Sequence, residues 1–163
     1  MFFARKSFQR TFAAVAVLTL FVIGCGSDDP MSEHEEHFEP EGLVIIDSGN
    51  RFFRYFEGAI DASGGRAGHL EVPNGGLTAK WSIMFLDHDG DEIAPPDDPD
   101  DSFTWAIADN TVAEVHQEPA DVGKFEFQLR GLKAGETTIE LQVTHDDHVD
   151  FRTIPIPVRV VDQ

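Results

Sequence analysis

The sequence contains a single cysteine, Cys25, among its 163 residues. One cysteine excludes a disulfide within the chain, so a folded domain of this protein must be held together by its apolar core. Basic residues are also few, because 12 Lys and Arg stand against 30 Asp and Glu. A surface of this charge repels nucleic acid and anionic lipid headgroups, and we expect no nucleic-acid partner.

Common catalytic signatures are missing as well. The sequence has no G-x-S-x-G and no H-E-x-x-H motif, and no glycine-rich phosphate loop follows a strand pattern and opens a helix. Carboxylates are abundant in acidic loops, but their abundance identifies no acid–base pair. We therefore predict that the protein is not an enzyme.

The longest apolar run, residues 11–23, lies at the N-terminus behind Arg5, Lys6 and Arg10. It is too short to span a bilayer as a stable helix, and a basic segment followed by a short apolar one is typical of a secretory signal peptide. Residues 1–24 hold three of the basic residues and none of the acidic ones, so the remaining chain has a formal charge of −21.

The end of this run, Val22-Ile23-Gly24-Cys25, resembles the lipobox of bacterial lipoproteins. In that family the preceding peptide is removed and the cysteine is acylated on its thiol and on its new amino group. Several acyl chains anchor a protein stably where one binds only reversibly. The resemblance implies that residues 1–24 are a lipoprotein signal peptide. It also implies that Cys25 is lipidated and holds the protein to the lipid bilayer of the cell envelope.

Gly26 follows the cysteine, where the aspartate that retains lipoproteins in the inner membrane of enteric bacteria would stand. We therefore expect placement in the outer membrane, facing the periplasm or the surface. The alternative for the whole N-terminus is an ordinary signal peptide, or a short membrane helix, with a chance cysteine.

Residues 25–39 contain the lipidated cysteine and an acidic segment that is poor in large apolar residues. Such a segment cannot bury enough surface to fold alone, and we predict a flexible tether. His34 and His37 stand in it at H-x-x-H spacing, and short histidine-rich acidic tracts bind metal weakly. The alternative is a solvated acidic linker.

From residue 40 onwards, short segments of alternating apolar and polar residues are separated by glycine-rich or aspartate-rich turns. A period of two indicates antiparallel strands with one buried face, and no window favours an amphipathic helix. Residues 40–163 are therefore predicted to form one all-β domain, a sandwich or barrel. The predicted strands cover residues 43–47, 51–56, 70–72, 81–85, 103–107, 125–129, 139–143 and 154–160.

Two details of this domain follow from strand parity and from proline chemistry. Trp81 and Trp105 occupy the alternate positions of their strands that carry the apolar residues, so both are predicted to be buried. Pro155 and Pro157 cannot donate to a strand ladder, which places the last strand at a sheet edge.

Two separated motifs resemble bacterial Ig-like domains of the group 2 type. Residues 105–115 match the pattern W-x-x-x-D-x-x-V-A-x-V, and residues 131–139 match G-x-x-A-G-x-T-x-I. The likeness covers residues 68–161. It implies an Ig-like antiparallel β-sandwich and a role as a spacer or adhesive module. The chain departs from the family in its length, in the additional hairpin at residues 43–56 and in its histidines.

The segment His145-Asp146-Asp147-His148 joins the last two predicted strands. If the two aspartates form a two-residue turn, the two histidines are directly opposed across the strands. Strand parity then places Asp150 on the same core-facing side, at one end of the sandwich. Two imidazoles and a carboxylate are suitable ligands for zinc or copper. Alternatively, one histidine simply hydrogen-bonds Asp150 and closes the end of the domain.

The sequence thus predicts an envelope lipoprotein with a non-catalytic binding domain. The proposed ligand is a divalent metal, zinc or copper, held by His145, His148 and Asp150 with help from His34 and His37. The competing hypothesis is a structural or adhesive Ig-like module with no metal, whose histidines are packing and surface groups. Besides the lipid bilayer, the expected partner is a divalent metal or a protein.

Overall fold

The computed structural model describes residues 38–146 and 148–162. The predicted signal peptide, Cys25, His34 and His37 lie outside the described residues. The described part is built from strands, with one short 3-10 turn at Ser63–Gly65 and no α-helix. Accordingly, no helix that is long and apolar enough to cross a membrane is found in residues 38–146 or 148–162.

The first sheet contains seven strands in the order β3-β2-β1-β5-β9-β8, with β6 paired to β5. All of its strand pairs are antiparallel. Ser48 and Gly49 both have positive φ and form the tight turn between the first two strands. The strands are β1 (Gly42–Asp47), β2 (Asn50–Phe56), β3 (Ala59–Ile60), β5 (Trp81–Leu86), β6 (Glu92–Ile93), β8 (Ala113–His116) and β9 (Glu126–Gly131).

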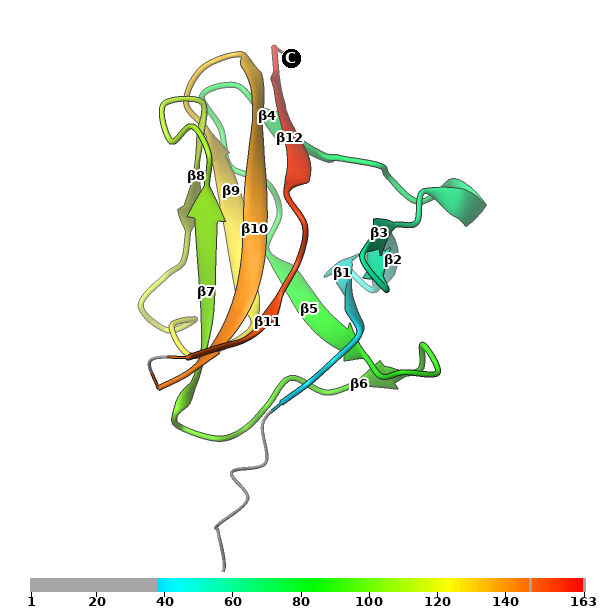
Figure 1. The fold of residues 1–163 in the computed structure, drawn as a ribbon. Helices are drawn as coiled ribbons and strands as arrows, with labels where there is room; N and C mark the ends of the chain where they lie inside the picture. Colours follow the sequence, from blue (N-terminus) through cyan, green and yellow to red (C-terminus); the bar gives the residue numbers. More distant parts are fainter. Residues whose placement is uncertain (1–37, 147, 163) are drawn as a thin grey trace, which may run out of the picture. The chain divides into compact units, whose positions relative to one another are not determined.

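The second sheet is organised around one long strand, β10 (Gly135–His145), which pairs with three others. Figure 1 shows β7 on one side of β10, with β11 and β12 on the other. The pair of β12 and β4 is parallel, which differs from the predicted all-antiparallel pairing. The other strands of this sheet are β4 (Leu70–Pro73), β7 (Asp101–Ile107), β11 (His148–Arg152) and β12 (Ile156–Val161).

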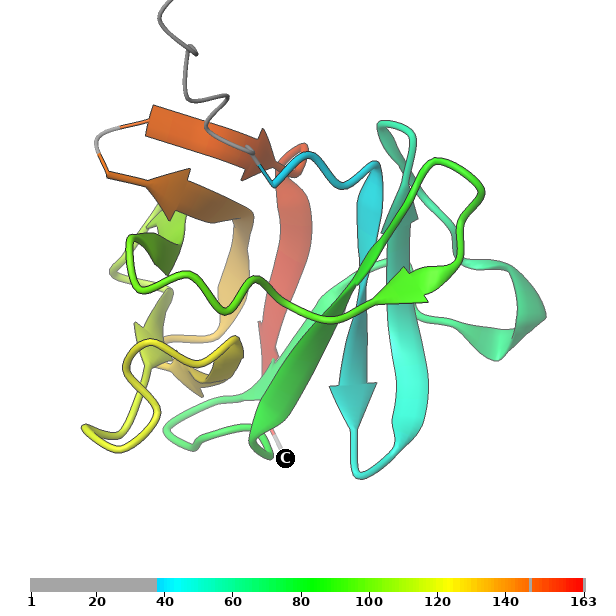
Figure 2. The same ribbon diagram turned by 90° about the horizontal axis from the view of Figure 1, so that it is seen from below.

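The core lies between the two sheets. Figure 2 shows β1 and β2 on one side of the domain and β10 and β11 on the other. Aromatic rings from the two sheets pack against each other. The ring centroids of Phe103 in β7 and Phe127 in β9 are 5.4 Å apart. Those of Phe85 in β5 and Phe151 in β11 are 5.6 Å apart. This confirms the predicted all-β, sandwich-like fold, which apolar packing holds without any disulfide.

The two tryptophans differ in their exposure to solvent, and the prediction that both are buried is wrong for Trp105. Trp81 is 5% exposed in the interior strand β5, whereas Trp105 is 36% exposed. Both stand on the core-facing parity, and Trp105 does contact Phe103, with 5.5 Å between the ring centroids. However, β7 pairs only with β10 among the described strands, so one side of the indole has no neighbouring strand to cover it.

The prediction that the last strand lies at a sheet edge is also wrong. Strand β12 lies between β10 and β4. Pro155 precedes the strand, and Pro157 lies opposite Thr138 of β10, one residue before Val158 forms the first pair with β4. The missing donors therefore fall at the start of β12, where proline is tolerated, and the strand continues inside the sheet.

Candidate functional site

The hairpin of β10 and β11 carries the predicted histidines. His145 and His148 are register partners, which confirms the predicted cross-strand pair. Asp146 has a φ of 48°, as a tight two-residue turn requires, and its N–H donates to the carbonyl of Asp100 over 3.1 Å. The turn is therefore tied to the segment that leads into β7.

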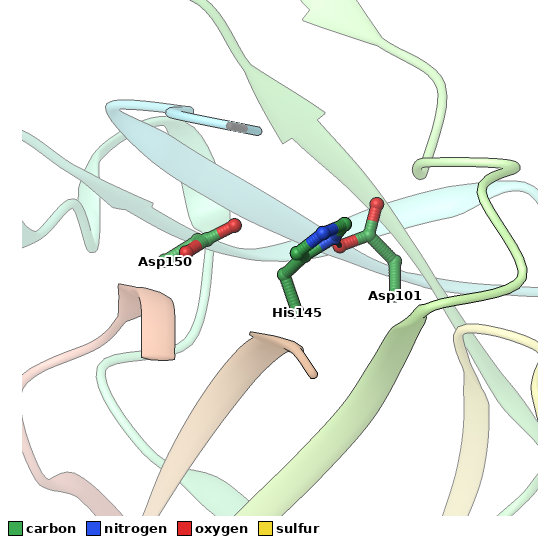
Figure 3. A group of neighbouring side chains, drawn as sticks. All are labelled: Asp101, His145 and Asp150. Carbon is green, nitrogen blue, oxygen red and sulfur yellow. Dashed lines mark hydrogen bonds and ion pairs between the residues drawn. The ribbon is translucent and has the colours of Figure 1, made fainter. Parts of the chain in front are cut away.

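Three side chains converge at this end of the second sheet. Asp101 begins β7, His145 ends β10 and Asp150 lies in β11. One ligand atom from each lies within 4.8 Å of the others. Figure 3 shows the imidazole of His145 between the two carboxylates.

Strand register explains why Asp101 and His145 meet. The two residues are directly paired in the ladder between β7 and β10. His145 Nδ1 lies 3.2 Å from Asp101 Oδ1, and it donates this hydrogen bond when it carries a proton. The exposed fractions of the two side chains are 18% and 6%, so the contact is largely shielded from water.

A β-bulge brings Asp150 to the same place. Val143 pairs with Phe151 and Thr144 pairs with Val149, so Asp150 is the additional residue on the β11 side. Bulges re-aim a side chain and are common beside functional sites. The Oδ2 atom of Asp150 is buried.

The carboxylates change the acidity of the histidine. The hydrogen bond to Asp101 raises the pKa of His145, burial opposes this shift, and the negative charges of Asp101, Asp146 and Asp150 add to it. The cluster therefore attracts positive charge, whether a proton or a cation.

This shift predicts a pH dependence of the metal-free chain. Because the pKa of His145 is raised in the folded state, protonated His145 stabilises the fold fully at pH values below its unfolded-state pKa of about 6.5. This stabilisation is lost as the pH rises through the pKa of the folded state. Wild type should therefore exceed His145→Gln in thermal midpoint at about pH 5.5, with a smaller difference at about pH 8.5. Both midpoints are measured by circular dichroism in the presence of a chelator. A difference that grows with pH would contradict the assignment.

The group offers one imidazole nitrogen and carboxylate oxygens, a donor set that suits zinc and copper. Three protein ligands leave a further coordination position for water or another group. Two ionised carboxylates also balance the charge of a divalent ion.

The structure brings together only part of the predicted ligand set. His148 is exposed and lines a neighbouring cavity of about 310 Å³ with Glu39, Val149 and Asp150, outside the convergent group. Sequence reasoning missed Asp101. Its signal was an aspartate two residues before a predicted strand, which identifies a ligand only when the pairing of that strand with β10 is known.

No protein-family model and no curated protein matches this chain. The resemblance to group 2 bacterial Ig-like domains therefore stays a prediction. Solved structures that match part of this chain include domains 4 and 5 of the S-layer protein SbsC, at 18% identity and a TM-score of 0.40, covering 58% of this chain and 48% of that one. A second, domains 4–9 of SbsC, has 18% identity and a TM-score of 0.42, covering 60% of this chain and 13% of that one. This chain thus spans less than half the length of either SbsC structure, and the likeness is too distant to indicate a shared function.

Proposed function

We propose that this protein is a non-catalytic envelope lipoprotein whose β-domain binds a divalent transition-metal ion, zinc or copper. The observation that carries the metal assignment is the convergence of Asp101, His145 and Asp150 from three strands, with ligand atoms within 4.8 Å of one another. Two of these residues were predicted from sequence as ligands. The third comes from a strand that the register places beside them.

Zinc titration of the soluble chain, residues 26–163, tests this function. Calorimetry should show one strong site per chain at neutral pH. Binding should weaken as pH falls, because ligation needs a neutral imidazole and the pKa of His145 is raised. Absence of heat from both zinc and copper would refute the proposal.

The second candidate is an Ig-like envelope module without a metal. The hydrogen bond between Asp101 and His145 favours it, because this contact by itself ties β7 to β10. The same titration separates the candidates, since a purely structural pair binds neither metal.

His34 and His37 are proposed as an accessory ligand set. A flexible tether, which the sequence predicts for residues 25–39, would keep these imidazoles at a raised effective concentration for a bound ion. Removing residues 26–37 should then weaken zinc binding without abolishing it.

The proposed envelope location rests on Cys25 and the preceding signal pattern. Replacing Cys25 by serine removes the only thiol that can receive a lipid, so the variant should lose label from a radioactive fatty acid and remain unprocessed or leave the membrane fraction. Equal labelling of wild type and Cys25→Ser would contradict lipidation.

A further inference from the structure

The outer edge of β7 offers unpaired backbone groups. Ala108 and Thr138 continue the ladder between β7 and β10 by one pair beyond Ile107 and Ile139. The N–H of Ala108 donates to the carbonyl of Thr138 over 3.0 Å, so these two residues form a hydrogen-bonded pair. Hydrogen-bonded and non-hydrogen-bonded pairs alternate in an antiparallel ladder. The N–H and C=O groups of Phe103, Trp105 and Ile107 therefore point away from β10, and no other described strand pairs with them.

This edge lacks the usual protection against pairing. Proteins cover exposed edges, shorten them, or place lysine, proline or a bulge in them. Strand β7 has seven residues, DSFTWAI, with neither lysine nor proline, and its register with β10 is unbroken. Trp105 is 36% exposed beside the edge, and it lines a shallow cavity of about 260 Å³ with Phe103 and Thr104.

The charge around the edge indicates which kind of partner fits. Asp97, Asp98 and Asp100 are exposed in the segment before β7, and Asp109 is exposed two residues after the strand. The turn before the strand is ordered, because Asp98 Oδ1 accepts the N–H of Asp100 over 3.0 Å and its carbonyl accepts that of Asp101 over 3.1 Å. Lys133 offsets part of the charge of Asp109, so the acidic segment before β7 dominates. This segment repels an equally acidic second copy and attracts a basic segment.

We propose that β7 is a docking edge, to which an extended lysine- or arginine-rich segment of a partner protein adds as a further strand. Main-chain hydrogen bonds to Phe103, Trp105 and Ile107 would supply affinity. An apolar side chain of the partner would cover Trp105, and basic side chains would lie near the flanking aspartates. This surface is independent of the metal proposal.

The probe is a peptide of about eight alternating lysine and valine residues, a typical strand length. NMR of the soluble chain should show slowed amide exchange at Phe103, Trp105 and Ile107 when the peptide binds. The matched peptide that is N-methylated on every second residue keeps its charge but cannot complete a ladder, and it should bind at least about tenfold more weakly. A glutamate–valine peptide should not bind.

Two variants distinguish the contribution of the Trp105 backbone N–H to peptide affinity from the contribution of its indole ring. Trp105→Pro removes an outward N–H and leaves the bonds to β10, so it should lose most of the affinity. Trp105→Ala keeps this N–H and should retain amide protection at Phe103 and Ile107 with reduced affinity. If Trp105→Pro fails to fold, the methylated peptide and Trp105→Ala still decide the matter. Equal affinity for the two lysine peptides, protection at another edge, or dimerisation of the chain through β7 would overturn the proposal.

Discussion

Replacing Trp81 by alanine is expected to lower the free energy of unfolding of the domain strongly. The side chain is 5% exposed in the interior strand β5. Its ring centroid lies 5.0 Å from that of Phe52 and 5.7 Å from that of Phe127. Truncating a buried aromatic costs about 3–5 kcal/mol, which is a large part of the 5–15 kcal/mol by which a typical domain is stable.

Trp105→Ala is the matched control for this loss. It removes the same side chain from a position that is 36% exposed at the edge strand β7, so the free energy of unfolding should fall much less. Urea denaturation of the two variants, followed by circular dichroism, compares them directly. Equal losses of stability would contradict the placement of these two residues.

Replacing His145 by alanine is expected to lower zinc affinity at least about 100-fold. Loss of a residue that merely orients a ligand already costs 10–100-fold, and this substitution removes the only nitrogen donor of the convergent group. His148→Ala is the control, because His148 lies directly across the strand pair but is exposed and outside the group. Its affinity should stay within about threefold of wild type.

Competition with a chelator of known affinity measures both variants, and their circular dichroism spectra check that each remains folded. An equal loss of affinity in the two variants would indicate that the originally predicted histidine pair is the ligand set. Full affinity in both would place the metal elsewhere.

The alternation of apolar and polar residues is sufficient to predict most of the strands. Segments 43–47, 81–85 and 139–143 were predicted to within a few residues, because one face of each must be buried and the other stays in contact with water. Strands β3, β6, β8 and β11 were missed, since segments of two to five residues are too short to show a clear period.

Position within a sheet was harder to predict than the strands themselves. Parity places Trp105 on the core side correctly, but exposure also depends on which neighbours flank the strand, and β7 has one only. Pro155 and Pro157 suggested that the last strand lies at a sheet edge, because proline has no backbone N–H to donate to a neighbouring strand. That argument does not say whether the residue lies at the start of the strand, where the donor is not needed.

The candidate site shows the same limit. The pairing of His145 with His148 follows from a local turn, and it was predictable. Asp101 is 44 residues from His145, so its role depends on a long-range pairing that one sequence does not specify. The bulge at Asp150 also has no signal in the alternation, although it decides which side chain turns toward the histidine.

The most direct test of the metal site is NMR of the histidine imidazoles during addition of zinc to the soluble chain. We expect the resonances of His145 to shift with saturation at one zinc per chain, while those of His148, His69 and His116 stay unchanged until zinc is in excess. Asp101→Asn should weaken the response of His145 because it removes a carboxylate ligand from the group. Equal shifts of all the imidazoles, or no shift of His145, would contradict a site formed by Asp101, His145 and Asp150.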